Sequence, residues 1–134
     1  MLQGTCLCGM VSFAAQNPPQ NPTVCFCSNC RRSSGHLGQL VAPFDTEFVA
    51  WHDTGNQIKR YVMTNTKSGK PNVKLFCGNC GSTLASIPGC WDGKKTELRL
   101  TLVDEFKKDY FPVSKYMEES EADFLNGNPP VNFV

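Results

Sequence analysis

The spacing of the eight cysteines constrains this chain more than any other feature of its sequence. They form a C-x-C pair, a C-x-C-x-x-C triplet, a C-x-x-C pair and a singleton: Cys6 and Cys8, then Cys25, Cys27 and Cys30, then Cys77 and Cys80, then Cys90. In an extended C-x-C segment both side chains point to the same side, and a C-x-x-C turn brings two sulfurs together. Each group can therefore present its thiolates to one metal ion, which predicts metal sites.

A disulfide framework is the competing interpretation of so many cysteines. Disulfide-rich secreted domains are usually shorter, contain a larger share of cysteine and follow an export signal. The first residues of this chain show neither the basic segment nor the apolar stretch of a signal peptide. We therefore expect a reducing compartment, the cytoplasm, where clustered cysteines serve as metal ligands.

The overall composition excludes several other classes of protein. At 134 residues the chain is long enough for one globular domain. A net charge of +1 argues against nucleic acid as a partner, because such binding needs a basic patch that releases counterions. No apolar run approaches the roughly 18–20 residues that span a bilayer, so we expect no membrane partner. The composition carries no prediction of the oligomeric state.

Short β-like runs between glycines and prolines predict a mostly-β domain of short antiparallel sheets. The runs cover residues 10–14, 23–26, 37–42, 44–51, 57–64, 73–76, 82–87 and 97–103, with Pro43 dividing two of them. Helical signals are limited to one turn at 28–33 and a short terminal helix at 122–125 behind a partial capping box. We expect one domain over residues 1–128 and an extended tail over 129–134.

The count of thiolates divides the cysteines into two zinc sites of different kinds. A closed structural zinc site needs four ligands, and the two pairs supply them: Cys6, Cys8, Cys77 and Cys80. Joining residues that lie 69 positions apart would constrain the unfolded chain and tie distant strands together. The triplet remains, and three protein ligands with one vacancy are typical of a catalytic zinc: Cys25, Cys27 and Cys30. The sequence therefore predicts two Zn²⁺ per chain.

Three alternatives to an open second site remain at this point. Cys90 stands in a turn that could fold inwards, where its thiolate would close the triplet site as a fourth ligand. His36 or His52 could close the site in the same way. In the third alternative the chain binds a single zinc ion, and the triplet is metal-free and redox-active.

Positive charge is expected beside an open tris-thiolate site. Three thiolates around Zn²⁺ leave a formal charge of −1, and a bound substrate thiolate makes it −2. Arg31 and Arg32 follow Cys30 directly, and we assign Arg31 to the catalytic group with the three cysteines. A proton carrier for a developing alkoxide is also needed, for which His36 and Asp104 are candidates.

Three motifs together resemble a known family, the glutathione-dependent formaldehyde-activating enzymes, which share their domain with centromere protein V. The motifs are GTCLCGMVSF at residues 4–13, CFCSNCRRSSG at 25–35 and FCGNCGSTL at 76–84. They occur in the family's order and spacing, and the resemblance covers roughly residues 3–125.

The resemblance implies a β-tent fold of sheets around two zinc ions. Carried across by motif, it implies a structural zinc at the two cysteine pairs and a catalytic zinc at the triplet. The implied activity is the formation of S-hydroxymethylglutathione from formaldehyde and glutathione, a carbon–sulfur lyase reaction run in the synthetic direction. A thiol such as glutathione, or its adduct, is then the expected partner, and its carboxylates need cations such as Arg31, Arg32 or Arg60.

The last third of the chain departs from the family's pattern. Residues 112–115 read Pro-Val-Ser-Lys and lack the family's His-Ile pair, and Phe124 stands in place of the usual Trp. Because these changes lie outside the three motifs, we expect them to bear on the substrate and to leave the zinc ligands unchanged. The alternative function is a non-catalytic, zinc-stabilised protein-binding module with a closed second site.

Overall fold

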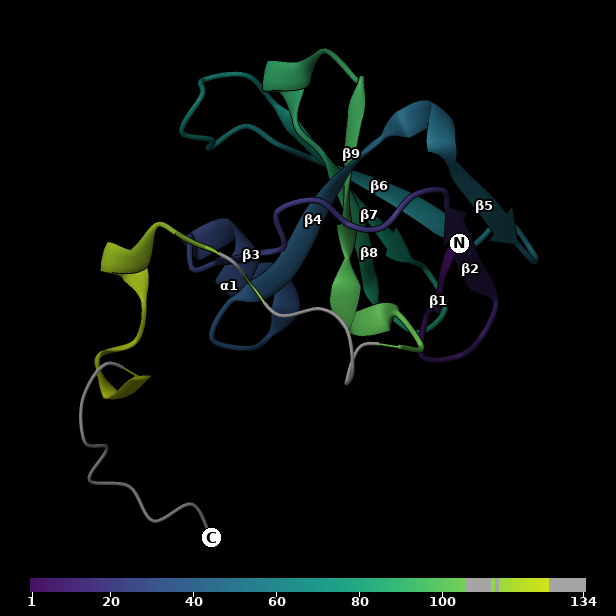
Figure 1. The fold of residues 1–134 in the computed structure, drawn as a ribbon, viewed down its shortest axis with the longest axis horizontal. Helices are drawn as coiled ribbons and strands as arrows, with labels where there is room; N and C mark the ends of the chain where they lie inside the picture. The colour runs from purple at the N-terminus through teal and green to yellow at the C-terminus, as the bar shows by residue number, and fades with distance from the viewer. Residues whose placement is uncertain (106–111, 113, 126–134) are drawn as a thin grey trace, which may run out of the picture.

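The structure is a computed structural model that describes residues 1–105, 112 and 114–125, and its strands form two sheets (Figure 1). Three strands make the small sheet, in the order β1-β2-β5: β1 (Leu2–Thr5), β2 (Val11–Ala15) and β5 (Val49–Asp53). Seven strands make the large sheet, in the order β10-β3-β4-β9-β8-β7-β6: β3 (Thr23–Cys25), β4 (Gln39–Asp45), β6 (Ile58–Met63), β7 (Asn72–Cys77), β8 (Thr83–Ile87), β9 (Lys95–Arg99) and β10 (Ser114–Tyr116).

Helical structure is scarce in the described part of the chain. The α-helix is α1 (Ser28–Ser34), which lies beside β3 at the left of Figure 1. Five single-turn 3₁₀ helices connect strands or follow them: η1 (Thr46–Phe48), η2 (Gly89–Trp91), η3 (Leu100–Leu102), η4 (Glu118–Ser120) and η5 (Asp123–Leu125). Over the same residues, no helix has the length and apolar character that crossing a membrane requires.

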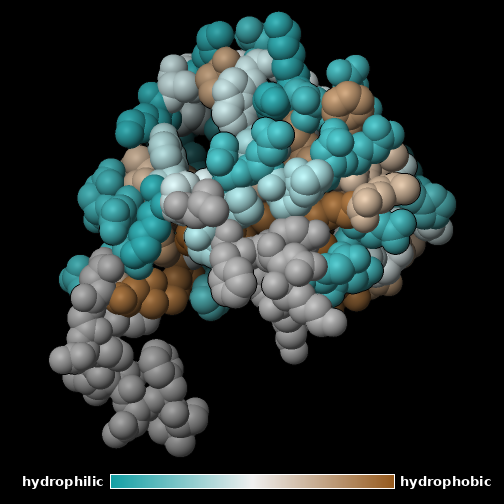
Figure 2. Space-filling model, in the orientation of Figure 1, coloured by the Kyte–Doolittle hydropathy of each residue, from teal (hydrophilic) through white to brown (hydrophobic). Residues whose placement is uncertain are grey.

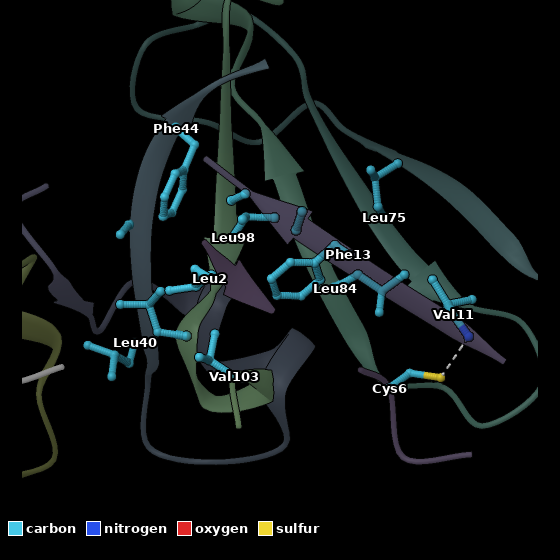
Figure 3. Close-up of a cluster of buried hydrophobic side chains, with 14 of the residues drawn as sticks. Leu2, Cys6, Val11, Phe13, Leu40, Phe44, Leu75, Leu84, Leu98 and Val103 are labelled. Atoms are coloured by element: carbon cyan, nitrogen blue, oxygen red, sulfur yellow. Dashed lines mark hydrogen bonds between the residues drawn. The ribbon is translucent and has the colours of Figure 1, made fainter. Parts of the chain in front are cut away.

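The hydrophobic core lies between the small sheet and one face of the large sheet (Figure 3). Val11 and Phe13 of β2 point into it and are almost fully buried. They belong to the same cluster as Leu98 of β9 and the alternate, core-facing side chains of β4 and β7. Burying a large apolar side chain of this kind contributes roughly 1.5–3 kcal/mol, so this contact between sheets is the main source of stability.

The opposite face of the large sheet carries a row of polar and charged side chains beside the apolar Val41 and Pro43, and it is called the polar face below. Strand register places its members on one side, because directly paired residues point to the same face: Cys25, Gln39, Lys74, Ser86, Glu97 and Arg99. The helix α1 covers this face, since the Ser33 hydroxyl accepts from Gln39 Nε2 at 2.9 Å and its carbonyl from Thr83 Oγ1 at 2.9 Å. The large sheet therefore separates an apolar layer from a polar one.

The outer surface is mostly hydrophilic in the view of Figure 2, with hydrophobic residues showing mainly near its middle and lower left. Across the described residues the exposed large hydrophobic side chains are scattered: Met1, Leu7, Tyr61, Val62, Trp91, Tyr116 and Leu125. Isolated apolar side chains of this kind are ordinary on protein surfaces.

The predicted mostly-β class is confirmed, and so is a helix at the triplet, which is longer than the single turn expected. Pro43 was expected to divide two strands, but β4 continues through it in register with Glu97. Proline has no N–H to donate, and β3, on the other side of β4, has already ended at its pairing with Val41. Because that side of β4 has no ladder partner at Pro43, the strand tolerates the proline.

Two other expectations on secondary structure were wrong. The strand expected over 97–103 ends at Arg99, and the chain turns through η3 so that Val103 bridges to Gly4 of the small sheet. A parallel pair joins β10 to β3, although only antiparallel pairs were expected. The short helix expected over 122–125 is present as the 3₁₀ turn η5, whereas β1, β10 and η4 were not anticipated. The predicted tail over residues 129–134 lies outside the described residues.

The core makes a direct prediction about stability. Leu98→Ala removes a side chain with no exposed surface from between the sheets, so it should lower the free energy of unfolding by about 2–5 kcal/mol in chemical denaturation. Val62→Ala, on the exposed edge strand β6, is the matched control and should change it by less than about 0.5 kcal/mol. Equal effects of the two substitutions would contradict the position of the core.

Candidate metal centres

Four cysteines from two hairpin turns meet at one end of the core. The sulfurs all lie within 4.8 Å of one another: Cys6, Cys8, Cys77 and Cys80. The Sγ atoms of Cys6 and Cys8 are 3.5 Å apart, and those of Cys8 and Cys77 are 3.8 Å apart. A tetrahedral zinc with bonds of about 2.3 Å places its sulfurs about 3.8 Å from each other, so this group, the first cluster, fits the ion.

Local backbone geometry forms the first cluster. After β7 the chain turns tightly, with the Gly81 N–H donating to the Cys77 carbonyl at 2.8 Å. Gly81 has a φ of +77°, a left-handed conformation that favours glycine. The β1–β2 turn is held to it by the Leu7 N–H, which donates to the Ser82 hydroxyl at 3.1 Å. Cys6 and Cys77 are buried members of the core, so the cluster links the two sheets.

The thiols of the first cluster differ in pKa because their surroundings differ. Burial raises the pKa of Cys77 to about 11. Burial acts to raise the pKa of Cys80, but its hydrogen bonds with Ser82, Cys8 and Cys77 together outweigh burial and lower that pKa to about 5. The Asn79 side chain lowers the pKa of the exposed Cys8. Thiols that share protons in this way suit a divalent cation, which takes the place of those protons.

The triplet forms a second cluster at the start of α1. Its sulfurs lie within 4.8 Å of one another, from the end of β3 to the first turn of the helix: Cys25, Cys27 and Cys30. Cys27 caps the helix, with its Sγ accepting from the Cys30 N–H at 3.3 Å. Gly38 packs closely behind, where a Cβ atom would lie 2.8 Å from the Cys25 carbonyl oxygen. The cluster therefore sits on the polar face of the large sheet, away from the core.

Mutual hydrogen bonding sets the pKa values of the second cluster. The thiols of Cys25 and then Cys30 donate to Cys27 and lower its pKa to about 2. Donation to Cys27 raises the pKa of Cys25 to about 11, and the pKa of Cys30 is raised for the same reason by Cys25 and Cys27. Cys27 is thus the member held as a thiolate. Three sulfurs within 4.8 Å of one another, one of them a thiolate, form a donor set suited to zinc.

The predicted fourth ligands do not join the second cluster. Among residues 1–105, 112 and 114–125, no further histidine, cysteine or carboxylate completes this group within 4.8 Å. Cys90 lies exposed on η2 and belongs to neither cluster. His36 is exposed beyond the end of α1, and His52 lies on β5 beside Thr54. Within this part of the chain, therefore, neither Cys90 nor a histidine provides a fourth ligand for the second cluster.

Arg31 and Arg32 lie in the last turn of α1 and are exposed. Asp104 is also exposed and lines, with His52, a pocket of about 330 Å³ on the outer side of the small sheet. The core separates that pocket from the second cluster, because the two occupy outward faces of different sheets. The structure thus places Asp104 apart from the triplet for which it was considered.

Sequence reasoning missed the charged residues that face the second cluster. Arg99 is 4% exposed and interacts electrostatically with all three thiols, most strongly with Cys30. Burial raises the pKa of Glu97, and Cys27 adds to that effect while Arg99 opposes it. Both residues come from β9, outside the three motifs. The only available signal was strand alternation, which places Glu97 and Arg99 opposite the core-facing Leu98.

Comparison with known proteins agrees with the three motifs. The sequence profile of the glutathione-dependent formaldehyde-activating enzymes matches residues 1–120. A Halomonas elongata protein that carries the name of this family is 32% identical in an alignment of 97 positions that covers 68% of this chain. The matched part spans 59% of that relative's length.

A solved structure shares the fold. The crystal structure of a Rhodobacter sphaeroides protein from a structural genomics programme superposes with a TM-score of 0.61 at 18% identity. The match covers 84% of this chain and 98% of that one. At this level of identity the similarity establishes the architecture alone.

The positions of the two clusters predict different consequences of metal removal. Cys77→Ala should reduce metal content by one ion and lower the melting temperature strongly, because its cluster links the two sheets. Cys30→Ala should also remove one ion but leave the melting temperature close to that of the wild type. Elemental analysis and thermal unfolding measure the two quantities. Cys90→Ala is the control, and any loss of metal from it would contradict the assignment.

Proposed function

The chain belongs to the family of glutathione-dependent formaldehyde-activating enzymes, and we propose that it is a zinc-dependent carbon–sulfur lyase. In this proposal it acts on a small thiol such as glutathione, or on an adduct of that thiol, and works in the cytoplasm. It carries two Zn²⁺ in one domain over residues 1–128. The first cluster holds the structural ion, and Cys25, Cys27 and Cys30 hold the catalytic one.

The observation that carries the proposal is the difference between the two clusters. The first has four thiols and lies against the core, which suits a closed site with a role in folding. The second has three and lies on the polar face of the large sheet, beside buried charge. Three protein ligands are what a zinc site that accepts an external ligand requires.

The reaction needs no redox change. A zinc ion held by three thiolates supplies a Lewis-acid position that favours the thiolate form of an external thiol. In the synthetic direction the substrate sulfur bonds to an aldehyde carbon, the carbonyl π bond opens, and the oxygen takes up a proton. The thiol loses one proton and the product hydroxyl gains one, so the atoms balance. Cleavage follows the same steps in reverse.

This chain's own residues supply the proton and hold the substrate. Glu97 shares the polar face with Cys25, and burial raises its pKa, which suits a carboxyl that donates and takes back a proton. We assign it the role of proton carrier in place of His36 and Asp104. Arg31, exposed at the end of α1, is placed to meet a carboxylate of the bound thiol from the solvent side.

Native mass spectrometry tests whether the second site accepts a thiol. The wild-type protein mixed with glutathione should carry two zinc ions and one glutathione, and Cys27→Ala should lose the adduct because it removes the capping ligand of that site. Cys90→Ala should keep the adduct. Two zinc ions with no adduct for any small thiol would indicate a closed site and a protein-binding module instead.

The role of Glu97 makes a separate kinetic prediction. Glu97→Gln keeps the shape of the side chain but removes the exchangeable proton, so it should lower the rate of adduct formation about 10²–10⁴-fold. Zinc content and glutathione binding should stay at wild-type values. The rate follows from NMR of formaldehyde and glutathione with catalytic amounts of protein. An unchanged rate in an active preparation would remove Glu97 from the reaction.

A further inference from the structure

Two buried polar atoms have no hydrogen-bond partner within the described residues: Gln39 Oε1 and Arg99 Nε. Gln39 is 6% exposed and Arg99 is 4% exposed, so water does not readily replace the missing partners. Both side chains lie on the polar face of the large sheet, because Gln39 pairs with Cys25 and Arg99 pairs with Val41. Native proteins rarely leave such groups unsatisfied, so a donor and an acceptor here indicate a ligand.

The guanidinium of Arg99 is held in one orientation by its neighbours. Nη2 donates to the Ser86 hydroxyl at 2.6 Å, and Nη1 donates to the Glu97 carbonyl oxygen at 3.3 Å. These contacts fix the planar group against β8 and β9 and leave Nε unpaired. A buried, permanently charged group of this kind needs negative charge nearby.

Within the described residues, the negatively charged partners of Arg99 are the second cluster and Glu97. They rank in strength as Cys30, Glu97, Cys25 and Cys27. Three of these four partners are sulfurs of the second cluster, and the fourth, Glu97, has a pKa that its burial raises. Lys74 lies on the same face, where burial and then Arg99 lower its pKa.

We propose that Arg99 is the fixed counter-ion of the second cluster and of the substrate thiolate that joins it. This inference rests on the proposed function, since three thiolates on a divalent ion leave −1 and a substrate thiolate makes it −2. One buried guanidinium offsets half of that final charge at a position that salt does not screen. Arg99 is a positioning residue in this role, because it acts on the sulfurs through space.

This role distinguishes Arg99 from the arginines that follow the triplet in sequence. Arg31 and Arg32 are exposed on α1, where water and salt weaken their effect on the cluster. Arg99 is buried and held by two hydrogen bonds. The positive charge that we expected beside Cys30 is therefore provided by Arg99 of β9.

The test is a zinc competition against a coloured chelator, which resolves the two sites by their affinities. Arg99→Met should weaken zinc binding at the second site about 10–100-fold, as loss of an outer partner typically does, and leave the first site unchanged. The weakening should persist at high ionic strength. Lys95→Met removes one positive charge from the exposed end of the same strand and should leave both affinities unchanged. Glutathione binding should weaken in parallel in Arg99→Met alone.

Each outcome separates this inference from the proposed function. Wild-type protein with two zinc ions and a glutathione adduct, together with an unchanged Arg99→Met, overturns the counter-ion role and leaves the enzyme proposal intact. Wild-type protein with a single zinc ion overturns both. If Arg99→Met also loses the zinc of the first site, Arg99→Lys, which keeps the positive charge, is the variant that tests the counter-ion role. Second-site affinity within a few-fold of the wild type supports the role of charge, and a complete loss of second-site zinc overturns it.

Discussion

The alternation of side chains along β9 connects the stability of this protein to its candidate chemistry. Thr96 and Leu98 point into the core between the sheets, while Glu97 and Arg99 point to the opposite, polar face. Because successive residues of a strand face opposite ways, one segment supplies both the packing and the charge. Shifting that strand by one residue would bury Glu97 and Arg99 in the core and turn Leu98 to the opposite face.

The two cysteine clusters occupy the two environments that this sheet separates. The first joins the β1–β2 and β7–β8 turns and includes buried members of the core, Cys6 and Cys77. A metal ion bound there would close a long loop and hold the small sheet against the large one. The second lies beside α1 on the polar face, where a bound ion would contribute less to the fold and, in the proposed function, would accept another ligand. The two clusters have the same kind of ligand but different surroundings, and these surroundings favour different roles.

Membership in the formaldehyde-activating family is shown by the match of its sequence profile to residues 1–120. The charged side chains beside the second cluster come from outside the cysteine motifs. Within the motifs, the sequence offered Arg31 as the cation beside the triplet, and the structure places it on the surface. The buried cation comes from outside the motifs, together with a carboxyl whose pKa is raised by burial. Substrate selection in this protein is therefore expected to depend on the sheet as much as on the cysteine-bearing turns.

By itself, the sequence determined the mostly-β class, the family and the division of the cysteines into four and three, because ligand spacing and strand alternation are local properties. The same local signals failed at Pro43, which β4 passes because the neighbouring strand has already ended, and at Arg99, where the chain leaves the large sheet. Only the tertiary structure decided which groups surround the triplet and that Cys90 stays away from it. Register between strands distant in sequence sets those positions, and spacing along the chain carries no record of it.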